Sequence, residues 1–250
     1  MRRWSLVFVL GSTLLALTVA GCRQGGGGET TPTSAPSPTA PVTAATAPDG
    51  GTLRVAEEGI SQIKDSTGKP MVSFGVVLES TSKTWIASGT AITVALADDS
   101  GKAVEDQIEH GKYSVHATLP QQKSGVGAQI YVGAPGATKL QVTIGTSTWY
   151  PKSYPGLAAI TASAVKTQRK TDTATFSFAL TSAYGRSVNG QFINIIFRDQ
   201  SGRLIGGAGL DLTKTCGTVP RGASTCTTGT TYALPDGTAD ARTEVYVDGT

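Results

Sequence analysis

Short stretches of alternating apolar and polar residues recur along the chain from residue 51 onward. In one of them Phe74, Val76 and Leu78 fall on a single face of an extended chain, and residues 92–96 and 140–144 repeat the alternation. A period of two, bounded by Gly, Ser, Asp and Pro, is typical of antiparallel strands that are buried on one face. The same region lacks the apolar period of a helix of about ten or more residues. The pattern therefore predicts an all-β fold.

The alternation is found a second time about 100 residues later. The matching segments are 74–78 with 176–180, 92–96 with 193–197, and the Asp-x-Ser-Gly-basic turns at 98–102 with 199–203. A repeat of this length predicts two copies of one domain, at residues 51–150 and 151–250. With roughly six or seven short strands in about 95 residues, each copy is predicted to be an immunoglobulin-like β-sandwich.

The N-terminal residues have the character of an export signal. Arg2 and Arg3 form a basic start, an apolar run extends from Leu6 to Val19, and small residues follow. A basic start, an apolar run and small residues before a cleavage point are typical of a secretory signal peptide. The run is shorter than the roughly 18 apolar residues that a transmembrane helix needs. We therefore expect residues 1–21 to be a signal peptide.

Residues 19–22, Val-Ala-Gly-Cys, resemble the lipobox of bacterial lipoproteins. The resemblance implies that the sulfur of Cys22 receives a diacylglyceryl group and that cleavage makes Cys22 the first residue. Acyl chains such as palmitate would then anchor the protein to the extracytoplasmic face of the cell membrane, since two chains suffice for stable anchoring. Residues 23–50 are rich in Gly, Thr, Ser, Ala and Pro and have little to bury, so we expect residues 22–50 to be a lipidated cysteine and a disordered linker.

A second resemblance lies within the repeats. Residues 94–98 and 195–199 each run from alternating strand residues into an acidic turn. They resemble the FxLYD-type immunoglobulin-like domains of bacterial envelope proteins, in which an aromatic-x-Leu-Tyr-Asp strand motif leads into an Asp-Gly hairpin. The tyrosine of that motif is absent from both copies. The resemblance implies tandem envelope domains and brings no catalytic residues with it.

The charge and the cysteine content limit which binding partners and which cellular compartment can be expected. The chain has 21 Lys and Arg against 18 Asp and Glu, without a run of like charges, so nucleic acid is not an expected partner. With Cys22 assigned to lipid, Cys216 and Cys226 remain, and an even pair in an oxidising compartment predicts a disulfide. The segment between them is polar, so we expect the bridge to stiffen a loop rather than to build a core.

Residues that could carry chemistry are few. On one strand, His110 and His116 would lie about 20 Å apart, too far to share a metal ion, although a turn at Gly111 could bring them closer. Surface histidines are the simpler interpretation. Acidic residues between 98 and 109 could hold Ca²⁺, but they lack the spacing of a calcium loop, and a hydrogen-bonded turn at residue 98 accounts for them more simply. No helix follows the glycines of residues 202–209, which favours a bulged strand or a close backbone approach over a phosphate site. We predict no catalytic residues, no metal site and no cofactor.

Three aromatic residues, Trp149, Tyr150 and Tyr154, lie between the two copies together with Pro151 and Pro155. They have two interpretations. One is packing between the domains, and the other is an exposed aromatic surface for a sugar or a peptide. If they are exposed, these three residues are the best candidate binding surface in the chain.

The expected function is that of a non-enzymatic lipoprotein that binds or positions another envelope component, either a protein or a glycan. One alternative is an envelope hydrolase that uses His110 or His116 with nearby carboxylates. Another is a carrier of a small ligand in a cleft between the domains. The sequence does not identify the ligand.

Overall fold

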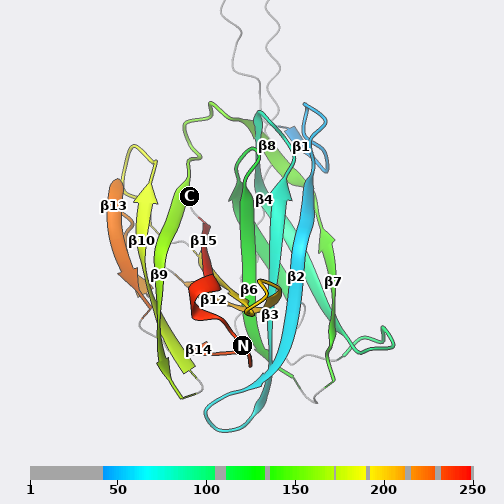
Figure 1. Ribbon diagram of the computed structural model, residues 1–250. Coiled ribbons are helices and arrows are strands. Elements are labelled where there is room, and N and C mark those ends of the chain that lie inside the picture. The colour runs from blue at the N-terminus through cyan, green and yellow to red at the C-terminus, as the bar shows by residue number, and fades with distance from the viewer. Residues whose placement is uncertain are drawn as a thin grey trace, which may run out of the picture. The chain divides into compact units, whose positions relative to one another are not determined.

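The computed structural model describes residues 42–104, 111–132, 136–171, 173–189, 192–211, 215–228 and 232–248. All of them belong to one compact unit, Pro38–Thr250. The fold is all-β and its sheets are antiparallel, as the alternation predicts (Figure 1). Among the residues that the structure describes, no helix has the length and apolar character needed to cross a lipid bilayer.

Two sheets face each other in the first half of the unit. One has the order β2-β3-β6, and the other has the order β1-β8-β4-β5 with β7 also paired to β4. Their inward side chains form one apolar core, in which Phe74, Ile92 and Trp149 are fully buried. The strands are β1 (Val42–Ala44), β2 (Leu53–Lys64), β3 (Pro70–Ser80), β4 (Trp85–Ala97), β5 (Gly111–Thr118), β6 (Lys123–Tyr131), β7 (Lys139–Ile144) and β8 (Ser147–Pro151).

The second half is built around a separate apolar core, which includes Phe176, Ile195 and Phe197. Its strands form a sheet of order β12-β11-β15-β9-β10-β13, with β14 also paired to β10. The elements are β9 (Ile160–Lys170), β10 (Thr173–Ser182), β11 (Phe192–Arg198), β12 (Leu204–Asp211), β13 (Gly222–Thr227), β14 (Tyr232–Ala233), the 3-10 helix η1 (Asp240–Arg242) and β15 (Glu244–Asp248).

The pairing of strands repeats between the two halves. β3 lies between β2 and β6, as β10 lies between β9 and β13. β4 pairs with β5 and β7, as β11 pairs with β12 and β15. The same pattern of strand pairs therefore occurs in both halves, although the second half forms one sheet where the first forms two. The division into two immunoglobulin-like domains at residues 51–150 and 151–250 stays a prediction, because both halves belong to the same compact unit.

The turns at Asp98 and Asp199 have the same hydrogen bonds. In each, one carboxylate oxygen accepts bonds from the N–H and hydroxyl of the serine two residues on and from the N–H four residues on. The hydroxyl bond is the main cause of the lowered pKa of each aspartate. The turn interpretation is thus confirmed at Asp98. Asp65 makes the same turn between β2 and β3, through Thr67 and Lys69.

The predicted linker ends earlier than residue 50. Val42–Ala44 pairs with β8 as an edge strand, and Ala47 is buried in the first core. The carboxylate of Asp49 accepts bonds from the backbone of Gly51 and from residues 82–84. The prediction of disorder is wrong for residues 42–50. Their apolar content is too low to offset the entropy cost of ordering, but their hydrogen bonds to distant strands offset it.

Cys216 and Cys226 form a disulfide, with their Cα atoms 5.3 Å apart. The pairing was expected, but its surroundings were not. Cys226 lies on β13 opposite Phe178 and is only 4% exposed, and Cys216 packs against the same core. The bridge therefore contributes to the second core, because the alternation of β13 turns Cys226 inward while its neighbours face solvent.

The Asp49 interactions give the first testable prediction. Burial acts to raise the pKa of this carboxylate, but its hydrogen bonds outweigh burial and lower the pKa to about 2. Asp49→Ala should reduce the free energy of unfolding by about 1 to 2 kcal/mol at neutral pH, as the loss of a capping side chain does. Urea unfolding measures the change, with Asp236→Ala, at another exposed aspartate, as the control.

The sign of the pH dependence follows from the lowered pKa. The stabilisation by Asp49 should be complete above its ordinary value of 3.8 and should disappear as the pH falls toward 2. The difference in the free energy of unfolding between the parent and Asp49→Ala should therefore become smaller over that pH range. A difference that is constant with pH, or equal to that of the control, would contradict this role.

Candidate functional site

The outer face of the β2-β3-β6 sheet packs directly on β11, β12 and β15 of the second half, and glycines make this contact possible. A Cβ atom on Gly75 would lie 2.7 Å from the carbonyl oxygen of Gly206. One on Gly207 would lie 2.7 Å from the carbonyl oxygen of Phe74 and 2.9 Å from the Cα of Gly127. At such distances only hydrogen side chains fit without movement of the backbone. We call this contact the glycine joint.

The glycine joint explains the glycine-rich segment at residues 202–209. β12 carries a register shift against β11 between Phe197 and Arg198, and its glycines meet the backbone of the first half. The sequence predicted either a bulge or a close backbone approach here, and the structure shows a register shift together with a close approach. A small apolar cluster of Val77, Ile196 and Leu204, with Tyr246 packed against it, fills the middle of the contact.

Short polar side chains add hydrogen bonds across the glycine joint. The hydroxyl of Ser73 donates to the carbonyl oxygen of Gly207 at 2.9 Å and accepts from the N–H of the same residue at 3.0 Å. Ser61 donates to the carbonyl oxygen of Ile205 at 2.6 Å. These bonds satisfy backbone groups that the close approach removes from water.

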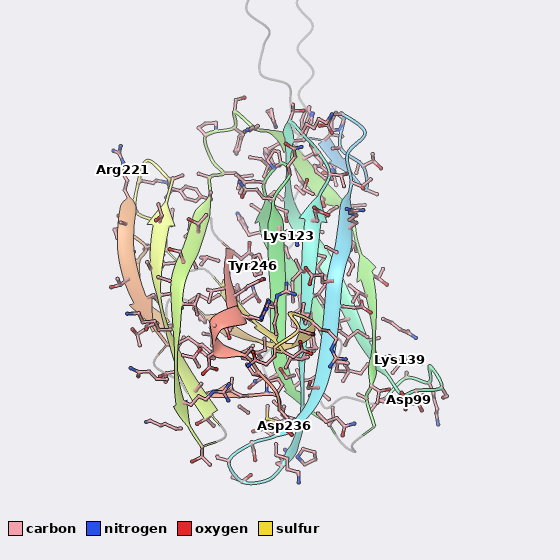
Figure 2. All side chains as sticks on the ribbon, viewed as in Figure 1. Asp99, Lys123, Lys139, Arg221, Asp236 and Tyr246 are labelled. Atoms are coloured by element: carbon pink, nitrogen blue, oxygen red, sulfur yellow. A yellow bond between two sulfur atoms is a disulfide. The ribbon has the colours of Figure 1, made fainter. Side chains whose placement is uncertain are left out.

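Arg198 bridges the two halves electrostatically. Its guanidinium pairs with Glu57 on β2 and, at 2.9 Å, with Glu244 on β15, while its side chain is only 9% exposed. Glu57 also pairs with Lys123 at 3.2 Å, and Lys123 and Tyr246, both labelled in Figure 2, line the same cavity. The hydrogen bond to Glu57 is the main cause of the raised pKa of Arg198, and the same bond lowers the pKa of Glu57.

Asp248 makes a further link between the halves. Its two carboxylate oxygens each accept a bond from the N–H of His116 at 2.7 Å, and one also accepts from Ala117 at 3.2 Å. The carboxylate therefore caps the edge of β5 with backbone bonds. Burial raises the pKa of Asp248 to about 6, although these hydrogen bonds act to lower it.

A cavity of about 200 Å³ lies beside this link, between β5 and β6 on one side and β9 and β15 on the other. His116 lies on β5, where burial lowers its pKa. The bonds of His116 to Asp248 come from its backbone N–H. His110, the other histidine of the hydrolase alternative, lies outside the described residues, as do the acidic residues at 105–109.

A larger groove of about 1010 Å³ opens where the β2–β3 turn of the first half meets the β9–β10 turn of the second. We call it the distal groove. Its apolar lining comes from Ile63, Pro70, Met71, Val132 and Leu234, and its charged lining from Lys64, Asp65, Lys170 and Asp236. The groove thus has an apolar wall and a rim that carries both signs of charge, as ligand sites often have.

A smaller hollow of about 310 Å³ adjoins the distal groove and shares Asp65 and Met71 with its lining. Tyr131 lines this hollow. Its phenol donates to Asp65 at 3.0 Å, and Lys69 stands over its ring with the Nζ atom 4.1 Å from the centroid. The bond to Asp65 is the main cause of the raised pKa of Tyr131. Through Asp65, Tyr131 therefore helps to fix one side of the groove from behind.

The aromatic surface predicted from Trp149, Tyr150 and Tyr154 needs a correction. Trp149 is fully buried in the first core, where its Nε1 donates to the carbonyl oxygen of Ala44 at 2.9 Å, so it is not part of any surface. The rings of Tyr150 and Tyr154 pack together at 4.4 Å, and Tyr154 is 39% exposed. Cys22, the predicted lipid attachment point, lies outside the described residues.

No protein-family model and no curated protein matches the chain. Within the described ranges, no group of three or more His, Cys, Asp or Glu residues is arranged to hold a metal ion. The distal groove was not identified from the sequence, although one signal was available. Residues 65–69 repeat the Asp-x-(Ser/Thr)-Gly-basic pattern of the two predicted turns, and this turn forms one side of the groove.

Asp248 gives the second prediction. Its pKa is about 6 in the folded protein, above the ordinary 3.8, so its favourable contribution is present below pH 3.8 and is lost as the pH rises through 6. Asp248→Asn keeps an oxygen acceptor without the charge. Between pH 3.8 and 6 the free energy of unfolding of the parent should fall by on the order of 3 kcal/mol or less, and that of Asp248→Asn should not show this fall.

Urea unfolding at a series of pH values between 4 and 7 measures the effect. The parent and Asp248→Asn should differ most in the slope of the free energy of unfolding against pH. Parallel profiles for the parent and Asp248→Asn would contradict a buried carboxylate with a raised pKa at the contact between the halves.

Proposed function

We propose that the protein is a lipid-anchored, extracytoplasmic binding module that acts without chemistry and takes an envelope component, a protein segment or a glycan, into the distal groove. The observation that carries the proposal is the groove itself, which combines about 1010 Å³ of space with apolar and charged lining. The anchor comes from the resemblance of residues 19–22 to a lipobox.

The position of the distal groove supports the proposal. The described chain starts at β1, which pairs with β8, and Thr46 bridges to Thr52 at the start of β2. β2 then continues for 12 residues to Lys64, beside the groove. At about 3.3 Å per residue this strand is roughly 40 Å long. A protein tethered ahead of β1 would therefore present the groove away from its tether, at the lower end of Figure 1.

The rigid walls of the distal groove also support the proposed binding function. One wall of the groove belongs to the first half and the other to the second. The glycine joint and the Arg198 ion pairs hold these halves together, so the groove does not have to be assembled when a partner arrives. A site formed in advance avoids part of the ordering cost of binding.

The volume of the distal groove also favours a second candidate function. It lies at the upper end of the range of about 300 to 1,000 Å³ that small-molecule sites occupy. A carrier of a small apolar ligand would use the same lining of Ile63, Met71 and Leu234. The two candidates differ in what stays bound when the protein is purified.

The third prediction tests the occupant. A photo-crosslinking amino acid at Ser66 or Thr171, on opposite rims of the distal groove, should give the same discrete adduct in cells. The same probe at Thr143, exposed on β7 of the outer sheet, is the control and should not give that adduct. Mass spectrometry identifies the captured component.

The outcomes separate the candidates. Equal adducts at all three positions, or none at either rim, would contradict binding in the distal groove. A small molecule retained in native mass spectrometry, without a protein or glycan adduct, would favour the carrier. The anchor is tested separately, since incorporation of radiolabelled palmitate should be lost in Cys22→Ala.

A further inference from the structure

At the end where the described chain begins, two tyrosines present aromatic surface to solvent. Tyr150 on β8 and Tyr154 beyond it pack at 4.4 Å with an interplanar angle of 35°. Tyr154 is 39% exposed and Val42 of the neighbouring strand is 42% exposed. Among the described residues, the exposed large apolar side chains are these two and Phe192, so two of the three are at this end.

The local fold holds the tyrosine pair outward. Trp149 points into the core, so the alternation of β8 turns Tyr150 to the opposite face. The N–H of Tyr154 donates to the carbonyl oxygen of Pro151 at 2.8 Å, which closes the turn. Gly156 lies against the ring, since a Cβ atom there would be 2.5 Å from it. The surface is thus set by the turn and does not depend on a partner.

Basic residues accompany the tyrosines. The N–H of Lys152 donates to the carbonyl oxygen of Thr84 at 2.8 Å, which places it next to Lys83, and both lysines are exposed. The acidic residue nearby, Asp49, uses its carboxylate to bind backbone and hydroxyl groups of residues 82–84. Arg221 of the second half lies at the same end of the molecule (Figure 2).

We propose that the surface formed by Lys83, Tyr150, Lys152 and Tyr154 rests on an anionic lipid bilayer. Tyrosine rings favour the headgroup region, where the apolar ring and the polar hydroxyl are both accommodated, and lysines favour anionic headgroups. The proposal rests on the lipid anchor of the proposed function. It gives the anchored protein an orientation, with the distal groove facing away from the membrane.

The length of the chain ahead of Val42 favours a membrane over a protein partner. Between Cys22 and Val42 lie roughly 20 residues, and the linker that their composition predicts would have a root-mean-square reach of about 25 Å. Lipidated Cys22 would therefore keep the tyrosine surface close to the bilayer. At that separation the effective concentration of the lipid surface is high, so even weak contacts are made.

The test uses the chain from residue 22 onward with Cys22→Ser, which keeps the compact unit Pro38–Thr250 and removes the acylation site. Flotation with vesicles of phosphatidylglycerol and phosphatidylcholine should recover this protein, and vesicles of phosphatidylcholine alone should recover clearly less. Tyr150→Ser with Tyr154→Ser, and separately Lys83→Glu with Lys152→Glu, should each reduce binding by about tenfold. Lys139→Glu, labelled at the lower right of Figure 2 and away from the upper end, should leave vesicle binding unchanged.

Thermal unfolding of each variant checks that the fold is retained, as expected because all five exchanged side chains are at least partly exposed. The inference is overturned if the parent does not bind the anionic vesicles, or if Lys139→Glu weakens binding as much as the other variants. Because the test uses a chain that cannot be acylated, its failure is distinct from the failure of Cys22 to incorporate palmitate.

Discussion

The close approach of two backbones across the glycine joint is the constraint on which the rest of the structure depends. Gly75, Gly127 and Gly207 have no room for a methyl group, since a Cβ atom would meet main-chain atoms of the opposite half at under 3 Å. The approach brings Ser73 within hydrogen-bonding distance of β12 and Arg198 within reach of Glu57. It also fixes the separation of the two turns that form the distal groove.

Much of the fold is predictable because it depends on local periodicity. The alternation around Phe74 and Phe176 requires one buried face per strand, and both residues are buried at equivalent places in β3 and β10. The turns at Asp98 and Asp199 are predictable for the same reason, since each aspartate bonds to its own next four residues. The glycines of β12 also signalled a close approach, although not its partner.

The features that escaped prediction depend on residues distant in the chain. Asp248 meets the edge of β5 only because β15 packs beside it, and no pattern near either element signals the contact. Trp149 has the neighbours of a proline-rich hinge, yet the ladder between β8 and β4 places it in the core. Residues 42–50 have the composition of a linker, and their order comes from bonds to residues 82–84 and to β8. The distal groove lies between two turns that belong to different halves, so it exists only in the packed structure.

We expect the glycine joint to make the two halves one cooperative unit. Differential scanning calorimetry of the parent, Gly207→Ala and Gly185→Ala measures this cooperativity, with Gly185→Ala as the control because a Cβ atom on Gly185 would meet nothing within 4 Å. We predict a single transition for the parent, a midpoint lowered by roughly 2 to 10 °C in Gly207→Ala, as overpacking costs of about 1 to 3 kcal/mol produce, and little change in Gly185→Ala. Two independent transitions in the parent, or equal effects of the two substitutions, would contradict it.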